Sequence, residues 1–69
     1  MMLISEQIRA ARMLLGWNQE NLAENSRLAT GTIKRIEAKD GPLSGNAETV
    51  WKIQGALERA GIEFISGDA

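Results

Sequence analysis

Cysteine, histidine and tyrosine are all missing from this 69-residue chain, and proline occurs once. The lack of cysteine excludes a disulfide framework and a thiolate metal site. The lack of histidine removes the usual zinc ligand and the commonest general base. Carboxylates and hydroxyls remain, but the sequence pairs none of them with an activating base. We therefore expect no enzyme, no metal site and no cofactor.

Long apolar runs are missing as well. No stretch approaches the roughly 20 residues of a membrane-spanning helix. The first residues, MMLISEQIRA, lack the basic start and long apolar centre of a secretion signal. We therefore expect a cytoplasmic protein without membrane contact. Hydrophobic residues make up 43% of the chain, so residues 1–69 are expected to fold as one domain with a small core.

The chain as a whole has no excess of positive charge, since its net charge is −1. This argues against nucleic-acid binding, because nucleic-acid-binding domains are usually basic. The charge is unevenly spread. Residues 27–39 carry a local +3, from Arg27, Lys34, Arg35 and Lys39 against Glu37. Residues 40–69 carry −3, from Lys52 and Arg59 against Asp40, Glu48, Glu58, Glu63 and Asp68. A basic segment on an acidic body indicates a localised binding site.

Apolar residues recur at helical spacing and predict an all-α fold of four short helices. The helices are expected at residues 5–15, 18–25, 30–37 and 46–60. N-caps are expected at Ser5, Asn18 and Asn46, and helix-ending glycines at Gly16 and Gly61. The inward-facing positions are Ile4, Ile8, Ala11, Leu15, Leu22, Ala23, Ile33, Ile36, Val50, Ile53, Leu57 and Ala60. Residues 62–66 alternate apolar and polar, which predicts a short extended tail that either folds back or pairs with the edge of a partner.

The two tryptophans are interpreted as packing groups rather than as stacking platforms for single strands. Trp17 precedes the second helix and is expected to pack against it. Trp51 falls beside the inner stripe of the last helix, so we expect a partly exposed packing or dimer contact. Met13 and Leu14 are expected at the edge of the core, under the tail.

The second and third predicted helices are joined by a turn of three residues, 26–28, which is the helix-turn-helix arrangement. Gly-Trp-Asn-Gln at 16–19, Leu22-Ala23, Thr32-Ile33 and Arg35-Ile36-Glu37 stand at matching spacing, followed by the ending Ala-Gly-Ile-x-Phe at 60–64. On these residues the chain resembles the phage-repressor and Cro type (XRE type) of DNA-binding domain, over roughly residues 5 to 65. The resemblance implies a lambda-repressor-like helix-turn-helix bundle.

That resemblance implies that residues 30–37 form a recognition helix that enters the major groove. Thr30 and Gly31 lead into the groove, where a threonine hydroxyl or methyl can meet a base and a glycine lets the backbone approach closely. Arg35 lies one turn further and can form a bidentate pair with guanine, worth roughly 1–3 kcal/mol of discrimination. Lys34 can reach a base or a phosphate.

The same resemblance implies that Asn18 and Gln19 hold a DNA phosphate at the start of the second helix. Lys39, after the recognition helix, and Arg27, in the turn, are further phosphate candidates. Arg27 stands where the family commonly has glycine. A left-handed conformation costs a non-glycine residue about 1–2 kcal/mol, so the turn either avoids that conformation or tolerates the strain. Ala29 cannot cap the recognition helix with its side chain, and Thr30 is the expected substitute.

Arg12 and Glu37 have a different part in the family, where they form a structural ion pair between the first helix and the end of the recognition helix. We therefore expect this pair to hold the recognition helix in place rather than to read DNA.

The expected function is a sequence-specific DNA-binding transcriptional regulator, a repressor in its simplest form. It would bind double-stranded DNA as a homodimer at a palindromic operator, with half-sites about 34 Å apart. The alternative is a protein-interaction module or an antitoxin-like partner that uses the same fold to bind another protein. In that case the acidic surface, Trp51 and Phe64 would matter most.

Overall fold

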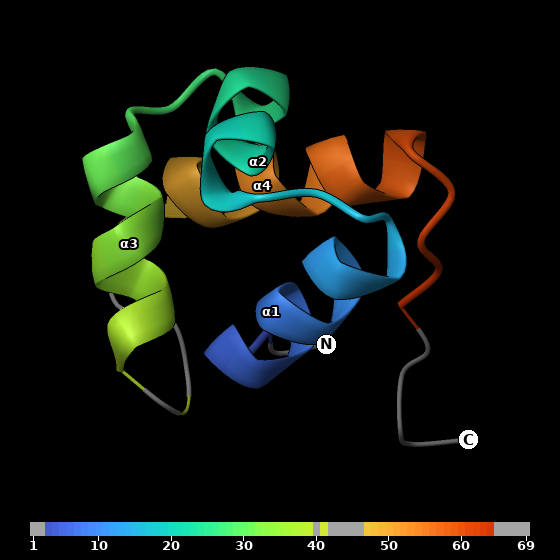
Figure 1. Cartoon of the computed structure of the whole chain (residues 1–69), viewed down its shortest axis with the longest axis horizontal. Coiled ribbons are helices and arrows are strands. Elements are labelled where there is room, and N and C mark those ends of the chain that lie inside the picture. The colour runs from blue at the N-terminus through green and yellow to red at the C-terminus, as the bar shows by residue number, and fades with distance from the viewer. Residues whose placement is uncertain (1–2, 40, 42–46, 65–69) are drawn as a thin grey trace.

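The computed structural model describes residues 3–39, 41 and 47–64, and four α-helices account for most of them. Their bounds are α1 (Ser5–Leu14), α2 (Gln19–Ser26), α3 (Thr30–Ala38) and α4 (Ala47–Arg59). The part of the chain that is described contains no strand, and residues 62–64 are irregular rather than a strand. α3 stands at one end of the long axis, and the segment after α4 runs along the opposite end (Figure 1). No described helix is long and apolar enough to cross a membrane.

The core draws one or more fully buried side chains from each helix. Ile8, Leu22, Ile33, Ile53 and Leu57 are all 0% exposed. The half-buried groups packed around them are Leu15, Trp17, Leu28, Val50, Ile62 and Phe64. Because Ile62 and Phe64 are among these groups, the tail folds back onto the core as far as it is described. The remaining predicted tail residues, 65–66, lie outside the described residues.

The starts of the helices differ in how they are capped. Asn18 caps α2 as predicted, since its side chain accepts a hydrogen bond of 2.8 Å from the amide of Asn21. The predicted cap at Ser5 is wrong, because Ile4 precedes the helix and its amide donates to the side chain of Gln7. α3 begins after Ala29 with no side-chain cap, so Thr30 does not take that part. Asn46 lies outside the described residues.

Three helices end in the same backbone motif. At each end a residue with positive φ is followed by an amide that bonds to a carbonyl five residues earlier: Trp17 to Arg12, Leu28 to Ala23, and Ile62 to Leu57. This is the Schellman motif. Glycine supplies the positive φ at Gly16 and Gly61, as predicted. The third such residue is Arg27, with φ 58° and ψ 42°, so the turn adopts the strained conformation rather than avoiding it.

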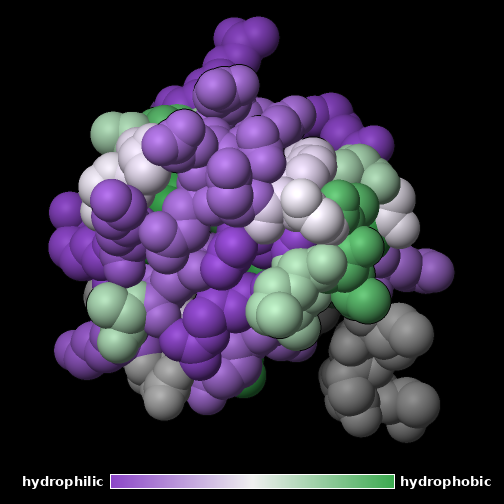
Figure 2. All heavy atoms as spheres, viewed as in Figure 1, coloured by the Kyte–Doolittle hydropathy of each residue, from purple (hydrophilic) through white to green (hydrophobic). Residues whose placement is uncertain are grey.

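The outer surface of α1 differs from the prediction. Met13 and Leu14 are 73% and 80% exposed instead of lying at the edge of the core. They follow Ile8 and Ala11 on the helix but point to its other side, because the core stripe already takes up one face. In the space-filling view most of the surface is hydrophilic, with hydrophobic groups gathered toward the end where the tail lies (Figure 2).

Candidate nucleic-acid interface

The outward side of α3 carries positive charge alone. Ile33, Ile36 and Glu37 are buried on its inner side. Gly31, Lys34, Arg35 and Ala38 are exposed on the outer side, and Thr30 is half-buried beside them. Helical spacing places Lys34 one turn after Thr30, and Arg35 one turn after Gly31. The four predicted base-contacting residues therefore share one face, and no carboxylate of α3 lies among them.

A buried ion pair fixes the inner side of α3. The guanidinium of Arg12 donates to both carboxylate oxygens of Glu37, from Nε to Oε2 and from Nη2 to Oε1, each at 2.9 Å. The third nitrogen, Nη1, donates to the carbonyl of Trp17 at 3.0 Å. The side chain of Glu37 is 3% exposed and that of Arg12 is 17% exposed. The ion pair expected between these residues is present, and it ties α1 to α3 and to the entrance of α2.

Gln19 joins the same cluster. Its amide nitrogen donates to Oε1 of Glu37 at 3.2 Å, so that carboxylate oxygen accepts from both Arg12 and Gln19. The side chain of Gln19 would have to keep this hydrogen bond to Glu37 while it contacts a phosphate as predicted. An amide has two N–H donors and a carbonyl oxygen, so a second N–H remains for a phosphate. The bond also orients the start of α2 relative to α3.

The far end of α3 is held by α1. Arg9 Nη1 donates to the backbone carbonyl of Glu37. The hydroxyl of Ser5 is buried and donates to the carbonyl of Lys39 at 2.6 Å. The amide of Ser5 donates to the carbonyl of Gly41 at 2.9 Å. These bonds satisfy carbonyls at the end of α3, which a helix cannot bond internally.

Ser5 and Arg9 were missed by reasoning from the sequence. Their spacing was a usable signal, because residues 5, 9 and 12 lie on one face of a helix at intervals of four and three. The spacing alone does not show that this face of α1 packs against α3.

A small hollow lies between the start of α2 and the start of α3. It has a volume of about 160 Å³ and is lined by Asn18, Gln19, Glu20, Thr30 and Lys34. Two predicted phosphate-contacting residues and two predicted base-contacting residues thus come together. The first amides of a helix have no partner within the helix and favour an anion. Glu20 is the one acidic residue of the lining and opposes that preference.

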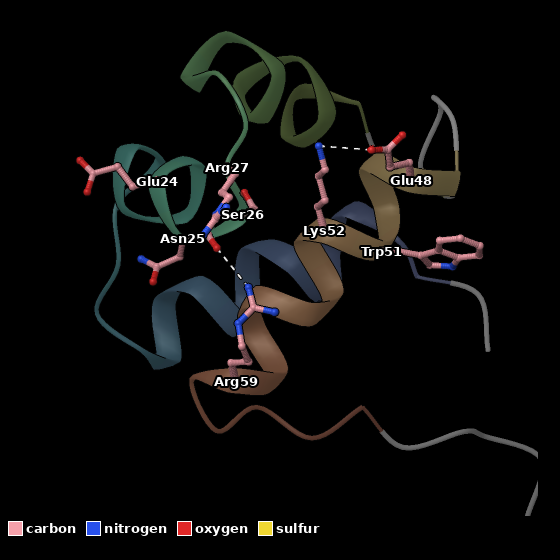
Figure 3. Close-up of a pocket in the computed structure, with 8 residues that line it drawn as sticks. All are labelled: Glu24, Asn25, Ser26, Arg27, Glu48, Trp51, Lys52 and Arg59. Carbon is pink, nitrogen blue, oxygen red and sulfur yellow. Dashed lines mark hydrogen bonds and ion pairs between the residues drawn. The ribbon is translucent and has the colours of Figure 1, made fainter.

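The other two predicted phosphate contacts lie elsewhere. Lys39 is exposed just beyond the end of α3. Arg27 is exposed in the turn after α2 and lines a groove shared with α4, where Lys52 and Arg59 are its cationic neighbours (Figure 3). The predicted contact set is therefore split between two surfaces.

Among the described residues, no group of three or more acidic side chains is arranged to hold a metal ion. Every buried polar side-chain atom there has a hydrogen-bond partner. The candidate site is thus an exposed cationic helix face on a satisfied polar scaffold. No family model matches the chain, and no curated protein or solved structure matches it significantly, so the function has to be argued from these residues.

Proposed function

We propose that the protein is a sequence-specific DNA-binding regulator with a phage-repressor-like helix-turn-helix fold, which inserts α3 into the major groove. The observation that carries the proposal is that the two sides of α3 have different properties. The outer side bears only positive charge, and the inner side is fixed by the buried pair of Arg12 and Glu37. A recognition helix needs both features, because base contacts require side chains held in a set geometry.

Base reading is assigned to the residues of the outer side. Arg35 is exposed and can form a bidentate pair with guanine, while Lys34 reaches a second base or a phosphate. Thr30 offers a hydroxyl to a base or a methyl to thymine. Gly31 has no neighbour within 4 Å of the position that a β-carbon would occupy, so the backbone there is open to close approach by a base edge.

Register on the duplex is assigned to the start of α2. Asn18 and the first amides of α2 would hold one phosphate at the hollow shared with Thr30 and Lys34. Such contacts orient a protein on DNA without reading sequence. Lys39 supplies a further phosphate contact from the other end of α3. Occupation of a promoter by a homodimer, with half-sites about 34 Å apart, would then repress transcription.

The test is selection of bound duplexes from a random library, followed by substitution of Arg35. We expect one recurring palindrome. The variant Arg35→Ala should bind this sequence at least about 5-fold more weakly for each half-site, because each half-site loses a bidentate contact, and its preference should relax at one base pair of each half-site. Glu63→Gln is the matched control, since Glu63 is exposed in the tail at the other end of the molecule. Unchanged affinity and preference in Arg35→Ala would refute the assignment of base reading.

Binding to another protein is the second candidate function. It is favoured by the large apolar side chains left on the surface, Met13, Leu14 and Trp51, of which Trp51 is 70% exposed. A domain of this fold could use them in an antitoxin-like complex. Failure of every duplex to enrich at low salt would favour this candidate over DNA binding.

A further inference from the structure

The larger of the two described hollows lies away from the outer side of α3. It is a groove of about 690 Å³ between the C-terminal end of α2, the turn that follows, and α4. Its lining residues are Glu24, Asn25, Ser26, Arg27, Glu48, Trp51, Lys52 and Arg59. We propose that this groove binds a phosphate group, held by Arg27, Lys52 and Arg59.

The groove is lined by three cations, Arg27, Lys52 and Arg59, and two carboxylates, Glu24 and Glu48. Arg59 reaches across from α4 to the end of α2, and Lys52 extends from the same helix with its amine directed toward Glu48 (Figure 3). Glu24 points away from Arg59, and Trp51 points outward at the far rim (Figure 3). Glu48 is the carboxylate nearest Lys52, at 3.5 Å, in a pair that is largely exposed. Such exposed pairs are weak, so a phosphate can compete with Glu48 for the amine.

Gly55 makes room for one of these cations. A glycine inside a helix lowers helix stability relative to alanine, so its place in α4 calls for a packing reason. A β-carbon at Gly55 would lie 3.1 Å from Nη1 of Arg59. A side chain at position 55 would therefore require the guanidinium of Arg59 to shift by a few tenths of an ångström from its place along α4.

Arg59 retains donors for a ligand. Its Nη2 donates to the carbonyl of Asn25 at 3.3 Å, which uses one of the five N–H donors of a guanidinium. Arg27 approaches from the turn and is exposed. Two guanidinium groups from different elements match the planar, bidentate recognition of a phosphate. Three positive charges suit a phosphate, which carries up to two negative charges, better than a single carboxylate.

The phosphate can come from two sources that share this chemistry. One is a free phosphorylated compound, which would cross-link α4 to the turn before α3. The other is the backbone of a bound duplex, which would extend the contact surface beyond α3. Binding of a free phosphorylated compound does not require that α3 binds DNA. The proposed phosphate site and the proposed DNA-binding function can therefore fail separately.

The first arm of the test uses the full chain labelled with ¹⁵N and sodium pyrophosphate as the probe, with sodium chloride at equal ionic strength as the reference. We expect selective shifts of the amide resonances of residues 25–27, 52 and 59. Arg59→Gln and Lys52→Gln should each bind pyrophosphate about tenfold more weakly, because each removes a hydrogen bond to a charged group. Glu63→Gln, which keeps the three cations of the groove, is the control and should bind pyrophosphate as the wild type does.

The second arm measures the salt dependence of binding to a pool of random duplexes. If the DNA backbone is the source, Arg59→Gln and Lys52→Gln should each reduce the slope of log K against log salt by about 0.9. Melting curves check that both variants fold, and the wild-type resonance map remains decisive if Arg59→Gln does not.

Amide resonance shifts with pyrophosphate that weaken in Arg59→Gln and Lys52→Gln identify a free phosphorylated ligand. A reduced slope of log K against log salt in the same variants identifies the DNA backbone. Pyrophosphate binding and a salt slope that both remain unchanged in Arg59→Gln and Lys52→Gln would overturn the proposal.

Discussion

Arg27 is the one non-glycine residue with positive φ in the described part of the chain. Glycine occupies the matching position of the other two Schellman motifs, at Gly16 and Gly61. The left-handed conformation strains a residue that has a β-carbon, and glycine escapes this strain at the cost of greater freedom when unfolded. Arg27 therefore carries a backbone strain that Gly16 and Gly61 do not carry.

Replacing Arg27 separates the effect of this backbone strain from that of the charge. Arg27→Gly should raise the free energy of unfolding by about 0.5–1 kcal/mol, the relief of strain less the added freedom of the unfolded chain. Urea denaturation monitored by circular dichroism measures it. Arg27→Ala is the matched control, because it removes the charge and keeps the β-carbon, so no gain is expected. A gain of equal size in both variants would mean that charge, and not backbone strain, sets the stability here.

Glu37 has a different kind of importance, because its carboxylate is buried together with its partner. Removing one member of a buried ion pair strands the other, and this typically costs about 3–5 kcal/mol. We expect Glu37→Leu to lose stability in that range, since Arg12 is 17% exposed and keeps little contact with water. The double variant Arg12→Met with Glu37→Leu should lose less than Glu37→Leu alone. Urea denaturation of the wild type, Glu37→Leu, Arg12→Met and the double variant tests this, and additive losses would show that the two residues are not coupled.

At the scale of the helix, α3 combines a weak start with a firmly bonded end. Ala29 gives its first turn no side-chain cap, and Gly31 lowers its helix propensity. Its last turn, in contrast, is bonded to Ser5, Arg9 and Arg12 of α1. The first turn of α3, which carries Thr30 and Gly31, is thus less stable than the last turn, which carries Arg35. If α3 enters a groove as proposed, its first turn could adjust to a duplex while its last turn keeps its direction.

Substitutions at Gly31 and Gly16 give a matched test of the low stability of the first turn of α3. Gly31 has ordinary helical φ and open space around it, so Gly31→Ala should stabilise the protein by up to about 1 kcal/mol. Gly16 has φ +70°, so Gly16→Ala should instead destabilise it by about 1–2 kcal/mol. Thermal melting measures both. If a base edge approaches the backbone at Gly31, the stabilised variant will also bind the selected duplex more weakly, and unchanged affinity would remove Gly31 from the contact set.

The helices themselves follow from local patterns, which explains why their positions could be predicted. Apolar spacing, the cap at Asn18 and the glycines 16 and 61 act within a few residues of one another, so the sequence displays them directly. The cap at Ser5 was mispredicted because its hydroxyl bonds to Lys39, which is distant in the chain. Met13 and Leu14 were mispredicted for a related reason. Apolar character does not tell which side of a short helix the tail will cover.

The candidate site was predictable to a similar extent. Helical spacing was enough to place Lys34 and Arg35 on one outer face of α3. The separation of Arg27 from Asn18 and Gln19 follows from their places at opposite ends of α2. The groove that Arg27 shares with α4 was not predictable, because it depends on how α4 packs beside α2. The same is true of the neighbours of Arg27 in the groove, Lys52 and Arg59, which follow it by more than 20 residues.

At the scale of the whole molecule, the ends of the long axis carry different surfaces. α3 lies at one end, while the tail and the gathered hydrophobic groups lie toward the other (Figures 1 and 2). A protein bound at the apolar end would leave α3 uncovered, so DNA binding and protein binding are compatible in one molecule. A second copy docked there would place the two α3 helices at opposite ends of the pair. A homodimer on adjacent half-sites would therefore have to use another surface.

The charge layout sets how strongly salt should weaken binding to DNA. Each phosphate neutralised by a cation contributes about −0.9 to the slope of log K against log salt. The cations predicted to contact the duplex from each protomer are Arg27, Lys34, Arg35 and Lys39, so without Lys52 and Arg59 the slope per protomer should be no steeper than about −3.6. If the DNA backbone also occupies the groove between α2 and α4, Lys52 and Arg59 would extend this limit to about −5.4. Asn18 and Gln19 are uncharged and add nothing to it. Fluorescence anisotropy on the selected duplex measures this slope.

Lys39 and Arg35 should respond differently in this measurement. Lys39→Gln should lower the slope by about 0.9 and weaken all sequences alike, because a phosphate contact carries no sequence information. Arg35→Ala should instead change which base is preferred at one position of the half-site. The comparison uses two exposed cations at the end of the same helix, so a general electrostatic effect would act on both. If both variants lower affinity without any change in base preference, α3 contacts the DNA backbone alone, and the protein binds DNA without reading its sequence through this helix.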